Sequence, residues 1–132
     1  KAINYIKKKN YLVIIITNQA CVGKSIITEK KLNLIHNKMQ KYLKSKNNAH
    51  VDDIFFSPYY RYSSNDEYKN NIFDRKPNPG MLIKAINKWN IDKKRSFFIG
   101  DSVTDNIAAK KIKIKFYYKN KTNLFNQLKK IL

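Results

Sequence analysis

One stretch, residues 97–105, constrains this chain more than any other. It begins with an apolar run over 97–99, which predicts a buried strand of a parallel sheet. Gly100 follows and permits a sharp turn or the close approach of another group to the backbone. Asp101 then lies at the carboxyl end of the strand, where open α/β sheets bind their ligands. Asp105 lies one helical turn further on and can approach it.

Two carboxylates at this spacing suit a hard cation such as Mg²⁺, which takes oxygen ligands. The alternative is a structural role, in which Asp101 only caps the following helix, because Asp is favoured at that position. The stretch alone leaves both interpretations open.

Helical and strand patterns alternate along the rest of the chain. Strands are predicted at 12–16, 51–56, 97–99 and 114–118. Helix starts are predicted at Thr28, Pro79, Ser102 and Thr122. The first of these helices is expected to end near Lys46. The second has an apolar face formed by Leu82, Ile83, Ile86 and Trp89. This alternation predicts an α/β fold, a Rossmann-like three-layer sandwich with a parallel sheet. Right-handed crossovers would place the carboxyl ends of all strands at one edge, so Thr17, Lys76 and Asp101 are expected to meet there.

The segment after the first strand, Thr17-Asn18-Gln19-Ala20, offers a hydroxyl, two side-chain amides and free backbone N–H groups. Such a loop can hold a phosphoryl group by hydrogen bonds, although a simple strand-ending turn has the same composition. Downstream, 23–25 resembles the end of a P-loop, but that pattern requires a glycine where Asn18 stands.

A second polar segment, 75–80, carries Arg75 and Lys76 followed by two prolines. Proline fixes the backbone and favours a helix start, so the two cations extend from a stiffened loop. A lysine held in this way can neutralise a phosphoryl oxygen and orient a carboxylate nucleophile. The alternative is a solvated charged turn.

Charge, cysteine content and the lengths of the apolar runs limit which classes of protein this chain can belong to. The 132 residues carry 28 Lys and Arg against 9 Asp and Glu, a formal net charge of +19. The lysines are spread along the chain and accompany abundant Asn and Ile, which indicates compositional bias more than a nucleic-acid site. The one cysteine, Cys21, excludes an internal disulfide, and no apolar run is long enough for a membrane span. We therefore expect a single cytoplasmic domain, 1–132, with no membrane partner.

Together these segments resemble the haloacid dehalogenase (HAD) superfamily of phosphohydrolases, in particular its D-glycero-D-manno-heptose 1,7-bisphosphate phosphatase and histidinol-phosphatase branch. The matching pieces are residues 17–23, 75–82 and 100–105, in the family's order and spacing. The resemblance implies a Mg²⁺-dependent phosphatase that forms a phospho-aspartyl intermediate on a small phosphorylated sugar.

The resemblance also implies a role for each matching residue. Thr17 and Lys76 would stabilise the transferring phosphoryl group, and Arg75 would hold the substrate. Asp101 would bind Mg²⁺ with support from Asp105. The remaining residues expected to line the substrate pocket are Asn18, Gln19 and Ala20.

The chain departs from this family in two places. The family's catalytic strand ends in Asp-x-Asp, a pattern that occurs nowhere here, since 52–53 is an adjacent pair. We therefore expect an amino-terminally truncated domain that lacks its first central strand and is inactive alone. Many heptose bisphosphate phosphatases also carry a Cys/His zinc cluster, and the matching positions here, Ser57, Tyr59, Ile72 and Asp74, predict no structural zinc.

Three functions remain open from the sequence. The first is a sugar-phosphate phosphatase, which we expect to be a monomer. The second is a non-catalytic relative that keeps the phosphate pocket. The third is a nucleic-acid-end phosphatase or a basic nucleic-acid-binding module, which would bind nucleic acid with a steep salt dependence.

Overall fold

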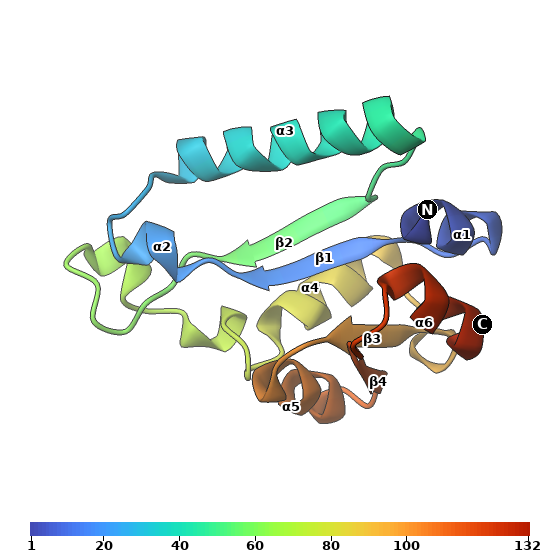
Figure 1. The fold of residues 1–132 in the computed structure, drawn as a ribbon. Coiled ribbons are helices and arrows are strands. Elements are labelled where there is room, and N and C mark those ends of the chain that lie inside the picture. Colours follow the sequence, from blue (N-terminus) through green and yellow to red (C-terminus); the bar gives the residue numbers. More distant parts are fainter.

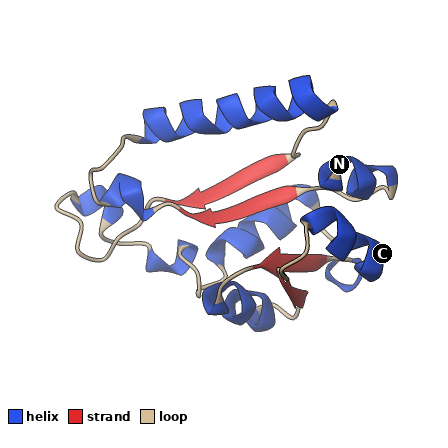
Figure 2. Ribbon diagram, viewed as in Figure 1, coloured by secondary structure: helices blue, strands red, loops and turns tan.

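Four parallel strands form two separate pairs in the computed structural model, which describes all of residues 1–132 (Figures 1 and 2). The strands are β1 (Ile14–Asn18), β2 (Asp53–Ser57), β3 (Phe97–Gly100) and β4 (Lys115–Tyr118). The helices are α1 (Ala2–Lys8), α2 (Ala20–Gly23), α3 (Glu29–Asn47), α4 (Gly80–Trp89), α5 (Val103–Lys111) and α6 (Leu124–Ile131). Three 3₁₀ turns, η1 (Asp66–Tyr68), η2 (Ile72–Asp74) and η3 (Lys93–Arg95), lie in the connections.

The pairing joins β1 to β2 and β3 to β4, and no ladder joins the two pairs. The α/β class and the parallel strands are confirmed, and the two separate pairs are what a sheet without its first central strand would leave. β1 and β3 therefore each keep one edge without a strand partner. In Figure 1 the arrowheads of β1, β2 and β3 point the same way, so their carboxyl ends lie toward one side.

Three strands, β1, β2 and β3, extend one or two residues further at their carboxyl ends than the sequence pattern predicts. Thr17 lies opposite Phe56 and Asn18 opposite Ser57 in the ladder, so both polar residues belong to β1 and not to the loop after it. Both side chains at this end of the ladder form hydrogen bonds, Asn18 with Lys76 and Thr17 with Gln19. The loop begins only at Gln19, whose N–H donates to the Ser57 carbonyl at 2.8 Å.

Side chains set the helix starts. The Thr28 hydroxyl accepts from the Lys31 N–H at 3.1 Å, which confirms the predicted cap of α3. The predicted Thr122 cap of α6 is wrong by one residue. Asn123 accepts from the Asn126 N–H at 2.9 Å, while the Thr122 hydroxyl donates to Asn120 at 2.6 Å.

The predicted buried face of α4 is also partly wrong. Pro79 lies just before the helix, and the fully buried side chains of α4 are Met81, Leu82 and Ala85. Ile83 is only half-buried, because the face that packs on β1 and β2 follows the spacing of those three residues. The Trp89 indole N–H donates to Asp53 at the amino end of β2, at 2.8 Å.

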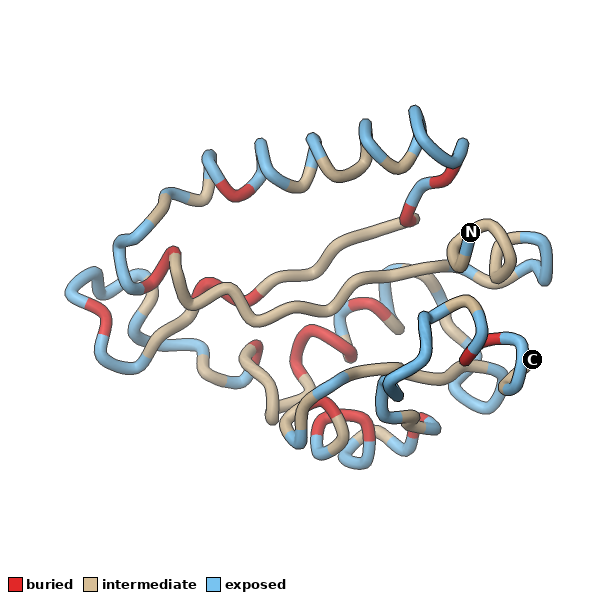
Figure 3. Tube along the Cα trace, in the orientation of Figure 1, coloured by how far each residue is buried: buried red, intermediate tan, exposed pale blue.

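The core lies mainly at the helices and not along the strands (Figure 3). Ala108 and Ala109 of α5 and Leu128 of α6 are fully buried, whereas every residue of β1 and β3 remains half-exposed. Apolar strands of a parallel sheet are ordinarily buried on both faces. The half-exposure of β1 and β3 follows from the open edges between the two pairs. None of the helices is both long and apolar enough to cross a bilayer.

Leu128 allows a direct test of this core. Its side chain is fully buried, so Leu128→Ala should lower the free energy of unfolding by about 3 kcal/mol, as measured by urea denaturation. Leu34→Ala is the matched control, because half of the Leu34 residue is exposed on α3 and its loss should cost less than about 0.5 kcal/mol. Equal losses in the two variants would contradict the assignment of the core.

Candidate functional site

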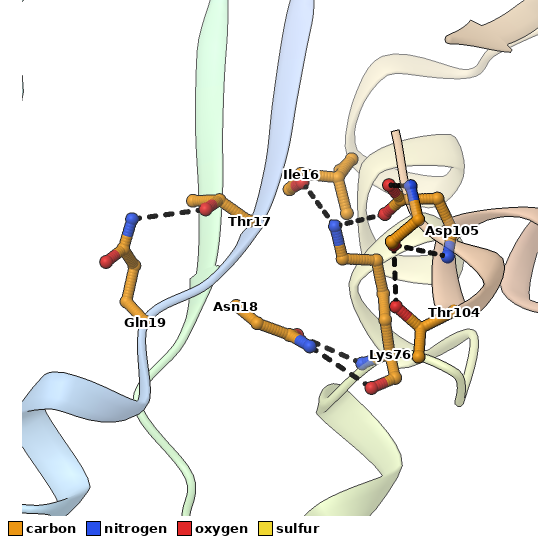
Figure 4. Close-up of polar contacts among 8 residues, drawn as sticks. Ile16, Thr17, Asn18, Gln19, Lys76, Thr104 and Asp105 are labelled. Atoms are coloured by element: carbon orange, nitrogen blue, oxygen red, sulfur yellow. Dashed lines mark hydrogen bonds and ion pairs between the residues drawn. The ribbon is translucent and has the colours of Figure 1, made fainter. Parts of the chain in front are cut away.

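Lys76 is the centre of the polar cluster at the carboxyl ends of the strands (Figure 4). Its Nζ donates to the Ile16 carbonyl of β1 at 3.0 Å and to Oδ1 of Asp105 in α5 at 2.5 Å. The Lys76 side chain is 10% exposed and the Asp105 side chain is 6% exposed, so the ion pair is nearly dry. The ammonium lies 5.8 Å from the centre of the Phe98 ring. The alternative of a solvated charged turn is therefore excluded for Lys76.

The turn that carries Lys76 is held by its own short bonds. The Asn78 N–H donates to the Arg75 carbonyl at 2.9 Å, and the Asn78 amide donates to the Ile72 carbonyl at 3.1 Å. The Lys76–Pro77 peptide bond is cis. Arg75 is half-buried, and its guanidinium donates to the Tyr59 carbonyl at 3.3 Å instead of pairing with a carboxylate. Arg75 therefore keeps donors for a further anion.

Asp105 is oriented by the start of α5. The Ser102 hydroxyl accepts from the Asp105 N–H at 3.2 Å, and the Asp105 carboxylate accepts from the Ser102 N–H at 3.3 Å, which completes a capping box. Gly100 makes room for this carboxylate, because a Cβ at Gly100 would lie 2.7 Å from the Asp105 Cβ. Gly100 has a negative φ, so the sequence pattern correctly indicates a close approach but not an unusual turn.

The environment of Asp105 keeps it ionised. Burial raises the pKa of its carboxyl, but the Lys76 ammonium and the Ser102 donors outweigh that effect and hold the pKa below its ordinary value of 3.8. The cluster therefore contains an ionised aspartate beside Lys76, and Lys76 can shift toward an incoming anion only by loosening this pair.

The Thr17 side chain lies on the other side of β1. Its hydroxyl accepts from the Gln19 amide at 3.1 Å, and Figure 4 shows both residues pointing away from Lys76. Successive side chains of a strand alternate between faces, so Thr17 and Asn18 diverge. Because the Thr17 oxygen accepts from Gln19, its own proton remains available for a phosphoryl oxygen.

Asn18 points toward Lys76. Its amide N–H donates to the Lys76 carbonyl and its amide oxygen accepts from the Lys76 N–H, both at 3.1 Å. Asn18 was expected in the substrate pocket, and no sequence pattern indicates this contact, because the two residues are far apart in the chain. Ala20 begins the short helix α2 immediately beyond.

Asp101 is exposed at the end of β3, and Asp105 is already paired with Lys76. No three His, Cys, Asp or Glu side chains of the chain cluster closely enough to hold a metal ion. Asp101 fits one ligand position of a Mg²⁺ ion, since a carboxylate at a strand end is a typical ligand and Mg²⁺ usually keeps several waters. A Mg²⁺ ion held by Asp101 would therefore need further ligands besides the carboxylates gathered here.

The four positions that match the zinc cluster of related phosphatases do not fit zinc. They offer one carboxylate, on Asp74, and no thiolate or imidazole. Asp74 is buried and bound by Asn71 and Lys84, while the Ser57 hydroxyl is buried without a hydrogen-bond partner. This part of the loop is held by hydrogen bonds.

The P-loop resemblance at 23–25 is likewise structural. The Gly23 N–H donates to the Pro58 carbonyl at 3.0 Å, and a Cβ at Gly23 would lie 2.8 Å from that of Tyr60. Lys24 lies 5.0 Å from the centre of the Tyr60 ring. The glycine serves close packing, and the lysine is turned toward an aromatic side chain.

The structure therefore brings only part of the predicted site together. Lys76, Asn18 and Asp105 form one connected cluster, whereas Thr17 faces Gln19 on the far side of β1. The expectation that Thr17, Lys76 and Asp101 share one contact set is not met in this structure. Ser102 and Thr104, whose hydroxyls lie 2.8 Å apart beside Asp105, were not predicted as site residues, although the Ser-x-x-Asp spacing is a capping-box signal.

The ion pair predicts a pH dependence of stability. Because the pKa of Asp105 is lower in the folded chain than its ordinary 3.8, its contribution is present at a pH well above that ordinary value and is lost as the pH falls through the lower folded-state pKa. Asp105→Asn should cost about 3 kcal/mol in the free energy of unfolding at pH 7, because it leaves Lys76 buried without a counter-charge.

The same variant should show a smaller loss of stability on acidification from pH 5 to pH 2 than the wild type does. Asp66→Asn is the control, since the Asp66 side chain is 91% exposed beside Lys69 and should change neither quantity measurably. An Asp105→Asn variant as stable as the wild type at pH 7 would refute the ion pair.

Comparison with known proteins identifies the family. The model of the family described as polynucleotide kinase 3 phosphatase matches residues 1–127. A D-glycero-beta-D-manno-heptose-1,7-bisphosphate 7-phosphatase of Rhodopseudomonas palustris is 37% identical over 109 residues, which are 83% of this chain and 60% of that protein. The enzyme of the same name from Pasteurella multocida is 33% identical over 115 residues, 87% of this chain and 61% of that protein. The chain thus spans less than two thirds of the length of these relatives.

Solved structures agree with the fold. A protein of Mesorhizobium loti described as a HAD-like phosphatase superposes with a TM-score of 0.79 at 24% identity, over 86% of this chain and 54% of that one. A D,D-heptose 1,7-bisphosphate phosphatase from B. bronchiseptica, complexed with magnesium and phosphate, superposes with a TM-score of 0.76 at 25% identity, over 99% of this chain and 68% of that one. The chain has the fold of HAD-like phosphatases and belongs to the polynucleotide kinase 3 phosphatase family.

Proposed function

We propose that the protein is a Mg²⁺-dependent phosphomonoesterase that acts on a small phosphorylated sugar, most specifically D-glycero-D-manno-heptose 1,7-bisphosphate. The observation that carries this proposal is the nearly buried Lys76 ammonium, fixed between the Ile16 carbonyl and Asp105 at the carboxyl ends of the strands. Relatives that carry the heptose bisphosphate phosphatase name match most of the chain, which supports the choice of substrate.

The proposed roles follow from the charges and free donors. Lys76 would stabilise the negative charge on the transferring phosphoryl group, because a fixed cation in a dry site acts strongly on developing charge. The Thr17 proton would reach a phosphoryl oxygen, and Arg75 would bind the substrate through its free N–H groups. Gln19 and Ala20 would line the pocket beside them. Asp101 would hold Mg²⁺ with Asp105 in support, and the bound ion would supply electrostatic stabilisation of the phosphoryl oxygens.

The nucleophile in this proposal comes from outside residues 1–132. β1 and β3 each have one unpaired edge, and their residues are half-exposed, which suits a further parallel strand between them. We propose that such a strand ends in Asp-x-Asp. Its first carboxylate would attack phosphorus and break the bond to the sugar oxygen, which would take a proton from the second, protonated carboxyl. Water would then attack the aspartyl phosphate and release inorganic phosphate.

A second candidate is a phosphatase that acts on nucleic-acid ends. The description of the matching family and the net charge of +19 favour it. Such an enzyme would bind its substrate through lysine–phosphate contacts, so its affinity would fall steeply with salt. A relative that binds phosphate without hydrolysis is the third alternative.

Release of inorganic phosphate by the full-length protein separates these functions. With Mg²⁺, we expect kcat/KM for the heptose bisphosphate to exceed that for a 3′-phosphorylated oligonucleotide by about 100-fold or more, since only the former would fill a small site. Lys76→Met should lower kcat by about 100-fold or more. Asp101→Asn should raise the Mg²⁺ concentration required for half-maximal activity, and a chelator should abolish turnover.

Lys119→Met is the control for Lys76→Met, because Lys119 is an exposed lysine bonded to nearby carbonyls and should leave kcat unchanged. A higher kcat/KM for the oligonucleotide would contradict the proposal and support the phosphatase that acts on nucleic-acid ends. Binding of inorganic phosphate without any turnover would indicate the non-catalytic relative.

A further inference from the structure

Asn18 is the residue whose observed contacts differ most from a substrate-binding role. A side-chain amide has one oxygen and two N–H groups. The Asn18 oxygen and one of its N–H groups are both engaged by the peptide groups of Lys76, each at 3.1 Å. The amide therefore behaves as a section of neighbouring backbone for Lys76, and its second N–H is the donor that these two bonds leave free.

This pair of bonds holds the backbone of Lys76 on β1, and a bond from the ammonium holds the end of its side chain there. Nζ donates to the Ile16 carbonyl, two residues before Asn18 on the same strand. The side chain of Lys76 thus runs along β1 and is fixed to it at both ends (Figure 4). No other hydrogen bonds join β1 to the turn 75–79, whose remaining backbone bonds stay within its own segment.

We propose that Asn18 is a positioning residue that holds the phosphate-stabilising Lys76 in register with β1, and that it does not itself bind substrate. The expected effect on kcat rests on the proposed phosphatase function. The two hydrogen bonds between Asn18 and Lys76, which we call the clamp, do not depend on turnover. A lysine on a flexible four-carbon stem can keep its ion pair while the turn shifts, so loss of the clamp misplaces the ammonium without removing it.

The chain contains a matched control. The Gln40 amide in α3 donates to the Val51 carbonyl at 2.8 Å and accepts from the Val51 N–H at 3.0 Å, which is the same pair of bonds to a single residue. Gln40 lies near the amino end of β2 and away from Lys76. Truncation of Asn18 or of Gln40 removes an equivalent pair of hydrogen bonds, but only the Asn18 pair lies at the proposed site.

The first test is hydrogen exchange of the full chain, measured residue by residue by NMR. Asn18→Ala should speed exchange of the Lys76 amide by about tenfold or more and leave that of Val51 unchanged, since exchange reports local opening. Gln40→Ala should give the reverse pattern. Asn18→Asp provides a second variant of equal size, in which a carboxylate oxygen replaces the N–H that faces the Lys76 carbonyl, and it should also speed exchange at Lys76. Unchanged exchange at Lys76 in both Asn18 variants would overturn the clamp.

The second test separates positioning from substrate binding in the full-length enzyme. Asn18→Ala should lower kcat by about 10- to 100-fold with KM within about twofold of the wild type, because misplacement by about 1 Å impairs the chemical step. Gln40→Ala should change neither constant by more than about twofold. A raised KM with unchanged kcat in Asn18→Ala would make Asn18 a substrate ligand and overturn the inference. If the wild type releases no phosphate, the proposed function fails and the exchange measurement alone decides the clamp.

Discussion

The ion pair between Lys76 and Asp105 joins two halves of the molecule that share no strand pairing. Lys76 is attached to β1 through its ammonium and its peptide groups, and Asp105 belongs to α5, which packs on β3 and β4. Both charged groups are nearly buried, so each is costly without the other. The capping box at Ser102 and the absence of a side chain at Gly100 fix the carboxylate in the position that the lysine requires.

This arrangement gives a physical reason for the polar ends of the strands. The last two residues of β1, where the strand reaches the site, are the polar Thr17 and Asn18, whereas the preceding residues are apolar. Their side chains point to opposite faces, so one strand end serves two tasks. Asn18 holds the lysine, and Thr17 with Gln19 presents a hydroxyl on the other side (Figure 4).

Much of the fold and part of the site follow from the sequence. Hydrophobic runs and cap residues predict the four strands, the long helix α3 and the proximity of Gly100 to another group, because these depend on local pattern. The cap of α6 and the buried face of α4 depend on tertiary packing, which local pattern does not encode. The Asn18–Lys76 clamp spans 58 positions, so no spacing rule could identify it. The sequence predicted only that the strand ends converge, and not that Lys76 and Asp105 form an ion pair.

A double-mutant cycle on Lys76 and Asp105 tests the central claim most directly. The free energies of unfolding of Lys76→Met, Asp105→Asn and the double variant would be measured at pH 7 by urea denaturation. The account predicts that the double variant is more stable than the sum of the single losses implies, with a coupling energy of about 2 kcal/mol, because each single variant leaves one buried charge unpaired. Additive losses, with a coupling energy near zero, would contradict it.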